Sequence, residues 1–201
     1  MSFHLEIPSD RSVQLRFDGK LTLAEFEEYC ARHPDLLIER EPDGQLTVMS
    51  PVHLLSGGQE ADVVIYLGIF VLPRKLGKVY SPTTGFTLPD GSVRSADASF
   101  VSAEQLSKLS EQDQHSFARV VPEFVIEVRS DSDAIGRLQT KMRDVWIANG
   151  VRLAWLIDPK NQVTYIHRAD GSEQVIAGFD KVLSGEDVLP GFELQLSVLE
   201  V

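Results

Sequence analysis

The sequence predicts a single α/β domain in which a mixed β-sheet lies between helices. Two observations lead to this fold class. Apolar helical segments alternate with short strand segments along a chain of 201 residues, a length typical of one domain. The hydrophobic fraction of 43% and the charged fraction of 24% are ordinary for a globular protein. Composition therefore excludes a disordered chain, a collagen-like fibre and a coiled coil.

The first expected element is a strand or arm over residues 3–15, followed by a helix. Thr22 and Glu25 have the spacing of a capping box, in which each side chain accepts a hydrogen bond from the backbone of the other residue. The helix should run to Arg32, because the dipeptide that ends in Pro34 disfavours further helical turns.

A hairpin is expected next, since residues 36–41 and 46–49 are extended segments on either side of a Pro-Asp-Gly turn. Together with the first helix it forms an N-terminal extension of about residues 1–51. The whole chain, residues 1–201, is still expected to be one domain, because no repeat or change of composition divides it.

The middle of the chain predicts a long buried helix and two strands. Val63, Leu67 and Phe70 recur at helical spacing within residues 56–76, and Gly77 suits the C-terminal cap. A helix this apolar should pack against a sheet. Strands are expected over residues 78–88 and 93–101, joined by a second Pro-Asp-Gly turn. The polar segment that follows, up to residue 119, should contain a short helix.

The C-terminal half predicts a strand–helix–strand unit. A strand over residues 124–128 precedes a helix over 133–148, and strands are expected again over 152–157 and 162–167. The apolar stripe that should bury the helix consists of Ile135, Leu138, Met142 and Val145.

Several function classes lack their usual signals. The sequence contains no phosphate-binding G-x-x-x-x-G-K-[ST] loop, no G-x-G-x-x-G and no G-x-S-x-G elbow. The five histidines are scattered, and the single cysteine, Cys30, excludes a zinc site made of several thiolates. A net charge of −11 argues against a protein that coats nucleic acid by bulk electrostatics.

The expected location is the cytoplasm. One cysteine cannot form an internal disulfide, which fits a reducing compartment. The first ten residues lack the basic start and apolar core of a signal peptide. The longest apolar stretch, within residues 63–72, is shorter than the ~20 residues of a membrane span, so no membrane is expected.

Two predicted strands carry a carboxylate where an ordinary core would not. Strand alternation places Glu127 on one face with Val125 and Arg129, while Asp97 lies within the strand at 93–101. Two carboxylates ~4 Å apart repel by roughly 4 kcal/mol at an effective dielectric constant near 20, and a divalent cation removes that repulsion. Oxygen ligands suit Mg²⁺ or Mn²⁺. The alternative is that Asp97 sits at a strand edge and Glu127 pairs with Arg129 or another base.

Lys141 is the third candidate residue. Its helical position borders the apolar stripe, so its ammonium can lean over the end of the sheet. An aspartate, a glutamate and a lysine at one sheet end form a plausible site for phosphodiester hydrolysis, in which the lysine orients the nucleophile or neutralises developing charge. The alternative is an ordinary surface lysine.

Six short segments occur in an order and spacing that resemble the Uma-type "putative restriction endonuclease" family, a branch of the PD-(D/E)XK nucleases. The resemblance covers about residues 21–199. Its segments are MSP (residues 49–51), TGFTLPDGSVRSADASFVS (84–102), PEFVIEVRSDSD (122–133), LQTKM (138–142), NGVRLAWLIDP (149–159) and LPGFEL (189–194).

The resemblance implies a restriction-endonuclease-like fold and roles for four residues. Asp97 corresponds to the aspartate of the PD element and Glu127 to the acid of the (D/E)XK element. Lys141 corresponds to a catalytic lysine that has moved to the next helix, because Arg129 occupies the usual lysine position. Glu39 matches an acidic position that can approach the metal, or else it is a surface residue of the hairpin.

The departures from the family pattern leave these presumed ligands in place. Ala96 replaces the proline of PD, Asp131 replaces a frequent proline, and Thr140 replaces a frequent glutamate. Arg129 cannot act as a base, because its pKa is too high. It can clamp a substrate phosphate, or it can pair with Glu127 and Asp131.

Two functions follow as hypotheses. The first is a Mg²⁺- or Mn²⁺-dependent endonuclease that hydrolyses DNA, with RNA as a further substrate that the sequence does not exclude. The second is an inactive, nuclease-derived module that works as a homodimer or binds a partner. The acidic charge supports the second, as does the breadth of the apolar stripe in the helix at 56–76. The acidic charge also predicts weak, salt-sensitive DNA binding without metal.

Overall fold

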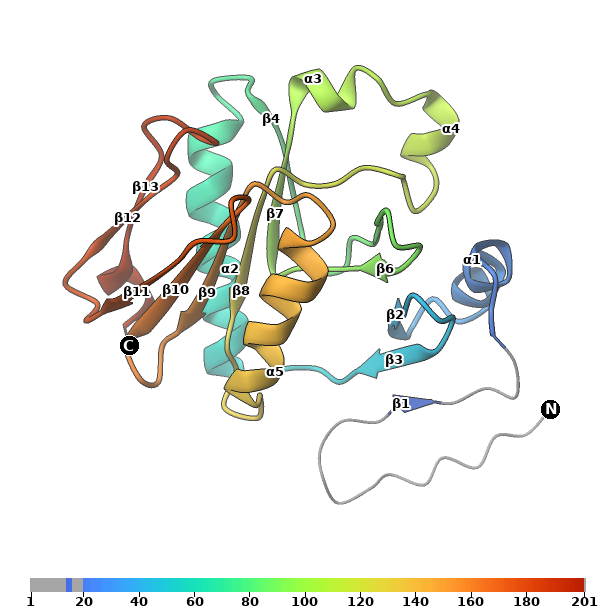
Figure 1. Ribbon diagram of the computed structural model, residues 1–201, viewed down its shortest axis with the longest axis horizontal. Helices are drawn as coiled ribbons and strands as arrows, with labels where there is room; N and C mark the ends of the chain where they lie inside the picture. The colour runs from blue at the N-terminus through green and yellow to red at the C-terminus, as the bar shows by residue number, and fades with distance from the viewer. Residues whose placement is uncertain (1–13, 16–19, 201) are drawn as a thin grey trace.

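A computed structural model describes residues 14–15 and 20–200 of the chain (Figure 1). Of the expected N-terminal arm, residues 3–13 lie outside the described residues, and the pair Gln14–Leu15 forms strand β1. The α-helices are α1 (Leu23–Arg32), α2 (Leu54–Val71), α3 (Ala103–Leu106), α4 (Glu111–Gln114) and α5 (Ile135–Thr140). A π-helix, η1 (Lys141–Ile147), continues α5, and a 3₁₀-helix, η2 (Leu196–Leu199), lies near the C-terminus.

The strands form three sheets. A six-stranded sheet has the order β11 (Glu173–Ala177), β10 (Val163–Arg168), β9 (Leu153–Asp158), β8 (Phe124–Val128), β7 (Ala98–Ser102) and β4 (Gly77–Tyr80). A five-stranded sheet has the order β1, β3 (Leu46–Met49), β2 (Leu37–Arg40), β6 (Val93–Arg94) and β5 (Phe86–Thr87). Strands β12 (Val182–Ser184) and β13 (Glu193–Gln195) form a separate hairpin.

The six-stranded sheet is mixed, as the sequence predicts. Only β8 and β9 run parallel, and the segment that links them contains α5 and η1. Figure 1 shows α2 behind this sheet and α5 in front of it. The helix–sheet–helix layering is the predicted α/β architecture.

Alternation along β8 separates two hydrophobic cores on the two faces of the sheet. Phe124 and Ile126 pack with Val63 and Leu67 of α2 on one face. Val125 packs on the other face, in a cluster that also contains Leu138, Met142 and Trp146. Glu127 has the same parity as Val125 and therefore points toward the face covered by α5 and η1.

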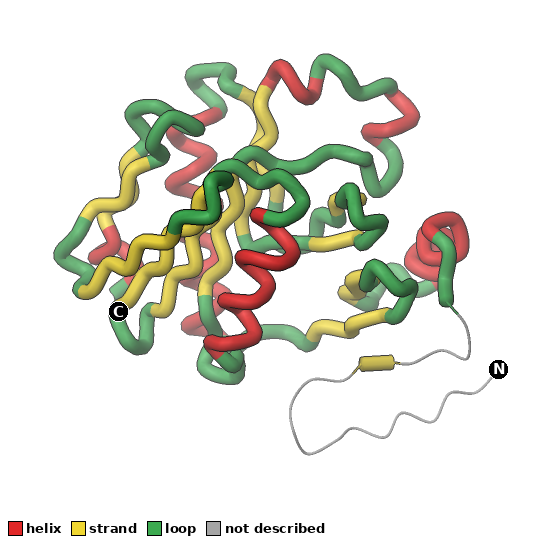
Figure 2. The backbone as a smooth tube through the Cα atoms, viewed as in Figure 1, coloured by secondary structure: helices red, strands yellow, loops and turns green. Residues whose placement is uncertain are grey.

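The five-stranded sheet ties the N-terminal part to the middle of the chain (Figure 2). Strand β2 pairs with β3 and also with β6, so the N-terminal unit does not end at residue 51. Helix α1 begins at the predicted capping box of Thr22 and Glu25, and Phe26 anchors it in a small core with Leu46 and Val93.

The prediction that Gly77 caps the long helix is wrong. Helix α2 ends at Val71, and Pro73 follows closely, whereas Gly77 begins β4 opposite Ser102. A Cβ atom at Gly77 would lie 2.1 Å from the carbonyl oxygen of Val101. Glycine is required here because two strands approach closely, and not because a helix ends.

Two predicted strands and one predicted helix are divided. The strand expected at 78–88 consists of β4 and β5, and the strand expected at 93–101 consists of β6 and β7. Each pair divides between the two sheets, because the chain passes from one to the other. The polar segment to residue 119 contains two short helices instead of one.

Helix α2, at 18 residues, is longer than the apolar stretch at 63–72. By length and composition alone, it is the one helix of the described residues that could cross a membrane, and 28% of it is buried. Val63, Leu67 and Val71 fix it to the sheet, while Ile65 and Ile69 are exposed.

Candidate active site

Asp97 and Glu127 come from neighbouring strands at one end of the six-stranded sheet. In the antiparallel pair of β7 and β8, Ala98 lies opposite Ile126 and Ser99 opposite Val125. Continuing this register by one residue places Asp97 opposite Glu127. Opposed residues have Cβ atoms about 5 Å apart on the same face of a sheet, so the two carboxylates are neighbours.

The pair places two acidic groups in a buried position, and Lys141 offsets their negative charge only in part. Glu127 is 5% exposed, and Asp97 is partly buried. Burial and the nearby Glu127 raise the pKa of Asp97 well above its usual range, although the backbone N–H of Val128 donates to Oδ2 of Asp97 at 2.6 Å. Burial also raises the pKa of Glu127, against the opposing effect of Lys141. A cation would relieve both penalties.

Lys141 reaches this pair from the start of η1. Its Nζ lies 2.9 Å from Oε1 of Glu127 and donates to the carbonyl oxygen of Ser95 at 3.0 Å. Burial lowers the pKa of Lys141, but Glu127 and Glu39 outweigh it and raise that pKa above its ordinary value. The alternative of an ordinary surface lysine is therefore wrong, since the ammonium is enclosed and held charged by carboxylates.

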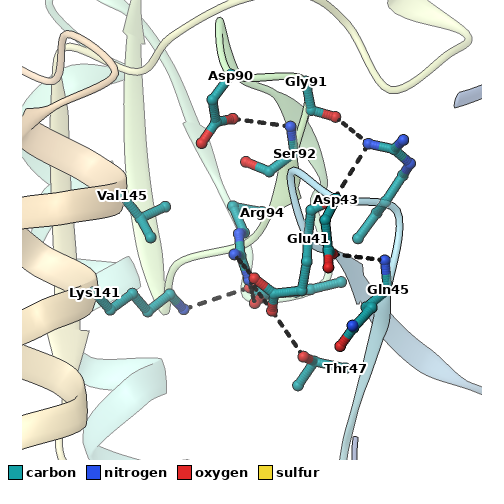
Figure 3. Close-up of polar contacts among 12 residues, drawn as sticks. Glu41, Asp43, Gln45, Thr47, Asp90, Gly91, Ser92, Arg94, Lys141 and Val145 are labelled. Atoms are coloured by element: carbon teal, nitrogen blue, oxygen red, sulfur yellow. Dashed lines mark hydrogen bonds and ion pairs between the residues drawn. The ribbon is translucent and has the colours of Figure 1, made fainter. Parts of the chain in front are cut away.

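Glu39 lies in the same cluster but is occupied by protein donors. It is 4% exposed, and its Oε1 accepts from the backbone N–H of Ser95 at 2.9 Å and from Lys141 at 3.4 Å. Its Oε2 accepts from Arg94 at 3.0 Å, and Arg94 also pairs with Glu41. Figure 3 shows Lys141 extending toward the carboxylates around Arg94. The alternative of a surface glutamate in the hairpin is wrong.

The predicted metal ligands do not gather as one set of three. Within residues 14–15 and 20–200, no group of three or more His, Cys, Asp or Glu side chains is arranged to hold an ion. Asp97 and Glu127 remain as neighbouring carboxylates, whereas Arg94 and Lys141 occupy the oxygens of Glu39. A cation here would need water or substrate oxygens to complete its coordination.

Arg129 does not pair with Glu127 or Asp131, contrary to one of the two alternatives for it. Its NH1 donates to Asp158 at 2.7 Å, and its Nε donates to the carbonyl oxygen of Asp133 at 3.1 Å. The reason is alternation and register, because the parallel strand β9 ends at Asp158 beside the end of β8. Arg129 and Lys160 line an open cavity of about 570 Å³.

Comparison with known proteins identifies the family. The chain matches Uma2, described as "Putative restriction endonuclease", over residues 23–198. The protein belongs to the Uma2 family. A search of curated proteins finds no match.

A solved structure supports the fold of this Uma2 chain. The crystal structure of a protein described as "a putative nuclease belonging to DUF820 from Anabaena variabilis ATCC 29413" superposes with a TM-score of 0.72 at 17% sequence identity. The alignment covers 89% of this chain and 97% of that one. The Uma2 chain therefore has the restriction-endonuclease-like fold, with a central mixed sheet flanked by helices.

Two further side chains reach this Uma2 site without having been predicted. Glu60 of α2 is partly buried, and burial, followed by Glu127 and Asp133, raises its pKa. A signal existed in the sequence, because Glu60 and Asp62 are the only charged residues of this helix. Trp146 donates from its indole Nε1 to Oε1 of Glu127 at 2.8 Å, and sequence periodicity gave no sign of that contact.

Proposed function

We propose that this protein is a divalent-metal-dependent endonuclease that hydrolyses phosphodiester bonds of DNA. The observation that carries the proposal is the juxtaposition of Asp97 and Glu127 across β7 and β8, with Lys141 at 2.9 Å from Glu127. Membership of a family described as "Putative restriction endonuclease" supports DNA as the substrate.

The carboxylate pair fits Mg²⁺ or Mn²⁺ by its donor chemistry. Among the described residues, none donates a hydrogen bond to Oδ1 of Asp97 or to Oε2 of Glu127, so one oxygen of each carboxylate is available. Mg²⁺ commonly binds one or two carboxylates and keeps water or phosphate oxygens as its other ligands. When bound, the cation supplies Lewis-acid stabilisation of phosphate charge and lowers the pKa of water.

Lys141 acts as a charged group in this proposal. Its raised pKa keeps the proton on Nζ at neutral pH, so it stabilises negative charge and does not abstract a proton. Its three N–H donors face Glu127, Glu39 and the carbonyl oxygen of Ser95. The contact with Glu39 is the longest, and its exchange for a substrate oxygen requires the least rearrangement.

Glu39 serves in this proposal as a residue that positions Lys141. Both of its oxygens accept from protein donors, which disfavours direct metal ligation. Arg94 and the backbone of Ser95 fix the carboxylate, and the carboxylate in turn orients the ammonium.

Arg129 is proposed to bind a substrate phosphate beside the catalytic pair. A guanidinium has five N–H donors, and the contacts with Asp158 and with the backbone of Asp133 use two of them. The side chain is two residues beyond Glu127 and lines the open cavity together with Lys160, whose ammonium pairs with Asp131 at 3.0 Å. A phosphate next to the scissile one could occupy that position.

Cleavage of plasmid and oligonucleotide DNA with Mg²⁺ or Mn²⁺ tests the proposed function. Wild-type protein should cut, whereas D97A should lose at least a hundredfold in rate. D187A is the matched control, because Asp187 pairs with Arg152 on the exposed surface and should leave the rate unchanged. Equal residual cleavage by wild-type and D97A preparations would show contamination and refute the proposal. A parallel RNA oligonucleotide decides the substrate class.

A second candidate function is an inactive module that pairs with a second copy of this chain. The observation that favours it is an exposed apolar face on α2 and the residue that follows it, where Ile65 and Leu72 are each 52% exposed and Ile69 is 66% exposed. No charged residue follows Asp62 in α2, so two copies could meet there without like-charge contact.

Light scattering tests that interface. I69E should convert a dimer to a monomer, whereas V175E, at an exposed apolar residue of β11, should not. A stable dimer that neither binds Mn²⁺ nor cleaves nucleic acid would favour the inactive module. A monomeric wild-type protein would exclude this interface.

A further inference from the structure

Lys141 and Trp146 contact the same oxygen atom of Glu127. The ammonium of Lys141 lies 2.9 Å from Oε1, and the indole Nε1 of Trp146 donates to that atom at 2.8 Å. The ammonium also lies 5.6 Å from the centroid of the Trp146 ring, within the range of a cation–π contact. The three groups therefore form one compact unit.

The π-helix explains how residues five positions apart reach one atom. In an α-helix, side chains five residues apart diverge by about 140° around the axis. Hydrogen bonds five residues apart occur here, such as from the N–H of Ala148 to the carbonyl of Arg143 at 3.0 Å. This wider turn brings Trp146 back over Lys141. Single π-turns of this kind are rare in proteins, but those that occur are often found at functional sites.

Trp155 provides an internal comparison. Both tryptophans are fully buried: Trp155 belongs to β9 and lies in the core on one face of the six-stranded sheet, whereas Trp146 of η1 lies in the core on the other face. Yet Nε1 of Trp155 has no hydrogen-bond partner among the described residues, whereas Nε1 of Trp146 is directed at a carboxylate. Burial of an indole in this core does not by itself require such a contact.

We propose that Trp146 is a positioning residue of the active site, which fixes Glu127 by donating to Oε1. With Lys141 and Trp146 both on Oε1, rotation of the carboxylate is restricted, which leaves Oε2 as the oxygen of Glu127 for a cation. This inference rests on the proposed function, because it assigns Trp146 a part in that same site. Residues that orient a metal ligand typically contribute 10–100-fold to affinity or activity, by order of magnitude.

The contact itself can be tested without catalysis. The indole N–H signals of Trp146 and Trp155 are assigned in a ¹H–¹⁵N spectrum from the W146F and W155F variants. In E127A the Trp146 signal should move upfield and exchange faster with solvent, because its acceptor is gone, while the Trp155 signal stays in place. An unchanged Trp146 signal in E127A overturns the inference.

Kinetics then separate positioning from packing. W146F removes the N–H donor and keeps an aromatic ring, and W155F is the matched control at an equally buried tryptophan with no hydrogen bond to lose. At saturating Mn²⁺, kcat of W146F should fall about tenfold with KM for DNA unchanged. W146Y, whose hydroxyl can donate, should recover part of kcat, and W155F should keep the wild-type value.

Equal losses of kcat in W146F and W155F would reduce Trp146 to a packing residue and overturn the inference. Failure of the proposed function is a separate result. If wild-type protein neither binds Mn²⁺ nor cleaves DNA, the nuclease proposal falls, and the indole signal in E127A still decides whether Trp146 holds Glu127.

Discussion

The two carboxylates at the end of β7 and β8 are placed where they cost stability. Burial and the neighbouring Glu127 raise the pKa of Asp97, which means that the folded state holds its charged form unfavourably. Functional sites commonly retain such unfavourable groups because activity requires them. At the residue scale, the candidate site should therefore be visible in stability measurements as well as in activity.

D97N should stabilise the metal-free protein. The pKa of Asp97 is higher in the folded state than its ordinary value of 3.8, so the folded state binds this proton more tightly. The free energy of unfolding therefore falls as pH rises from about 3.8 through the raised folded-state pKa of Asp97. Asparagine removes this loss and can still accept from Val128. Urea unfolding at pH 7 should show a gain on the order of 1 kcal/mol.

Two comparisons complete that experiment. The gain should shrink at acidic pH, where Asp97 is protonated in both states, and Mn²⁺ should raise the stability of wild-type protein more than that of D97N. A D97N protein that is no more stable than wild type at pH 7 would contradict the electrostatic account of the pair.

K141M should destabilise the protein strongly. The change leaves Glu127 and Glu39 buried without their shared cation, and breaking a buried ion pair costs about 3 kcal/mol. Denaturant unfolding measures the loss. K181M is the control, because Lys181 pairs with Asp180 at the exposed surface, where ion pairs contribute little. The same small effect in both variants would mean that Lys141 is not part of a buried cluster.

At the scale of elements, side chains hold the N-terminal hairpin onto the rest of the molecule. Backbone pairing between β2 and β6 is limited to Arg40 opposite Val93. Arg94 adds ion pairs to Glu39 and Glu41 at the same junction. Although burial opposes it, the charges of Lys141 and Arg94 hold the pKa of Glu39 below its ordinary value.

R94K should loosen this junction selectively. Lysine keeps the charge but cannot bind two carboxylates through a planar fork, with an expected cost of about 2 kcal/mol. Hydrogen exchange should become faster in β2 and β3 while β9 is unaffected. R152K, at the exposed pair with Asp187, is the control. Uniform exchange in R94K and wild type would show that backbone pairing alone holds the hairpin.

Local signals predicted most of the elements but not their junctions. The capping box at Thr22 predicts the start of α1, and the Pro-Asp-Gly turn predicts a tight turn where Gly91 has φ +83°. The strands within residues 78–101 were harder to predict, because the chain moves between two sheets there. Strand periodicity does not reveal which sheet a residue joins. Gly77 was misread for another reason, because the close approach of β4 and β7 that requires a glycine there is a tertiary contact.

The π-helix shows why helical periodicity mispredicted a buried residue. The expected stripe ends at Val145, but the wider turn of η1 buries Trp146 fully and leaves Val145 partly exposed. A pattern read at 3.6 residues per turn cannot detect that shift. Consequently the contact between Trp146 and Glu127 was not predictable from spacing.

The candidate site was predictable in part. Strand alternation set Asp97 and Glu127 apart as acids in buried strands, and the family resemblance indicated Lys141 and Glu39. The partners of Glu39 could not be predicted, because Glu39, Arg94 and Lys141 are brought together only by tertiary structure. The same holds for the pair of Arg129 and Asp158, which depends on the register of β8 against β9.

At the scale of the whole molecule, the net charge of −11 opposes contact with DNA. The metal-free protein should therefore bind a DNA duplex weakly, with an affinity that falls further as salt increases. A divalent cation should strengthen binding, because it reverses the local charge at the carboxylate pair. Fluorescence anisotropy of labelled DNA, with and without Ca²⁺, measures both effects. Tight, salt-independent binding by metal-free protein would contradict this expectation.

The most direct test of the account is a crystal of the protein grown with Mn²⁺ and recorded at a wavelength where manganese scatters anomalously. The account predicts an anomalous peak between Asp97 and Glu127, within ligand distance of both carboxylates, and no such peak in D97A crystals. A fully loaded crystal with no peak there, or with manganese bound elsewhere, would contradict the claim that these two residues hold the catalytic cation.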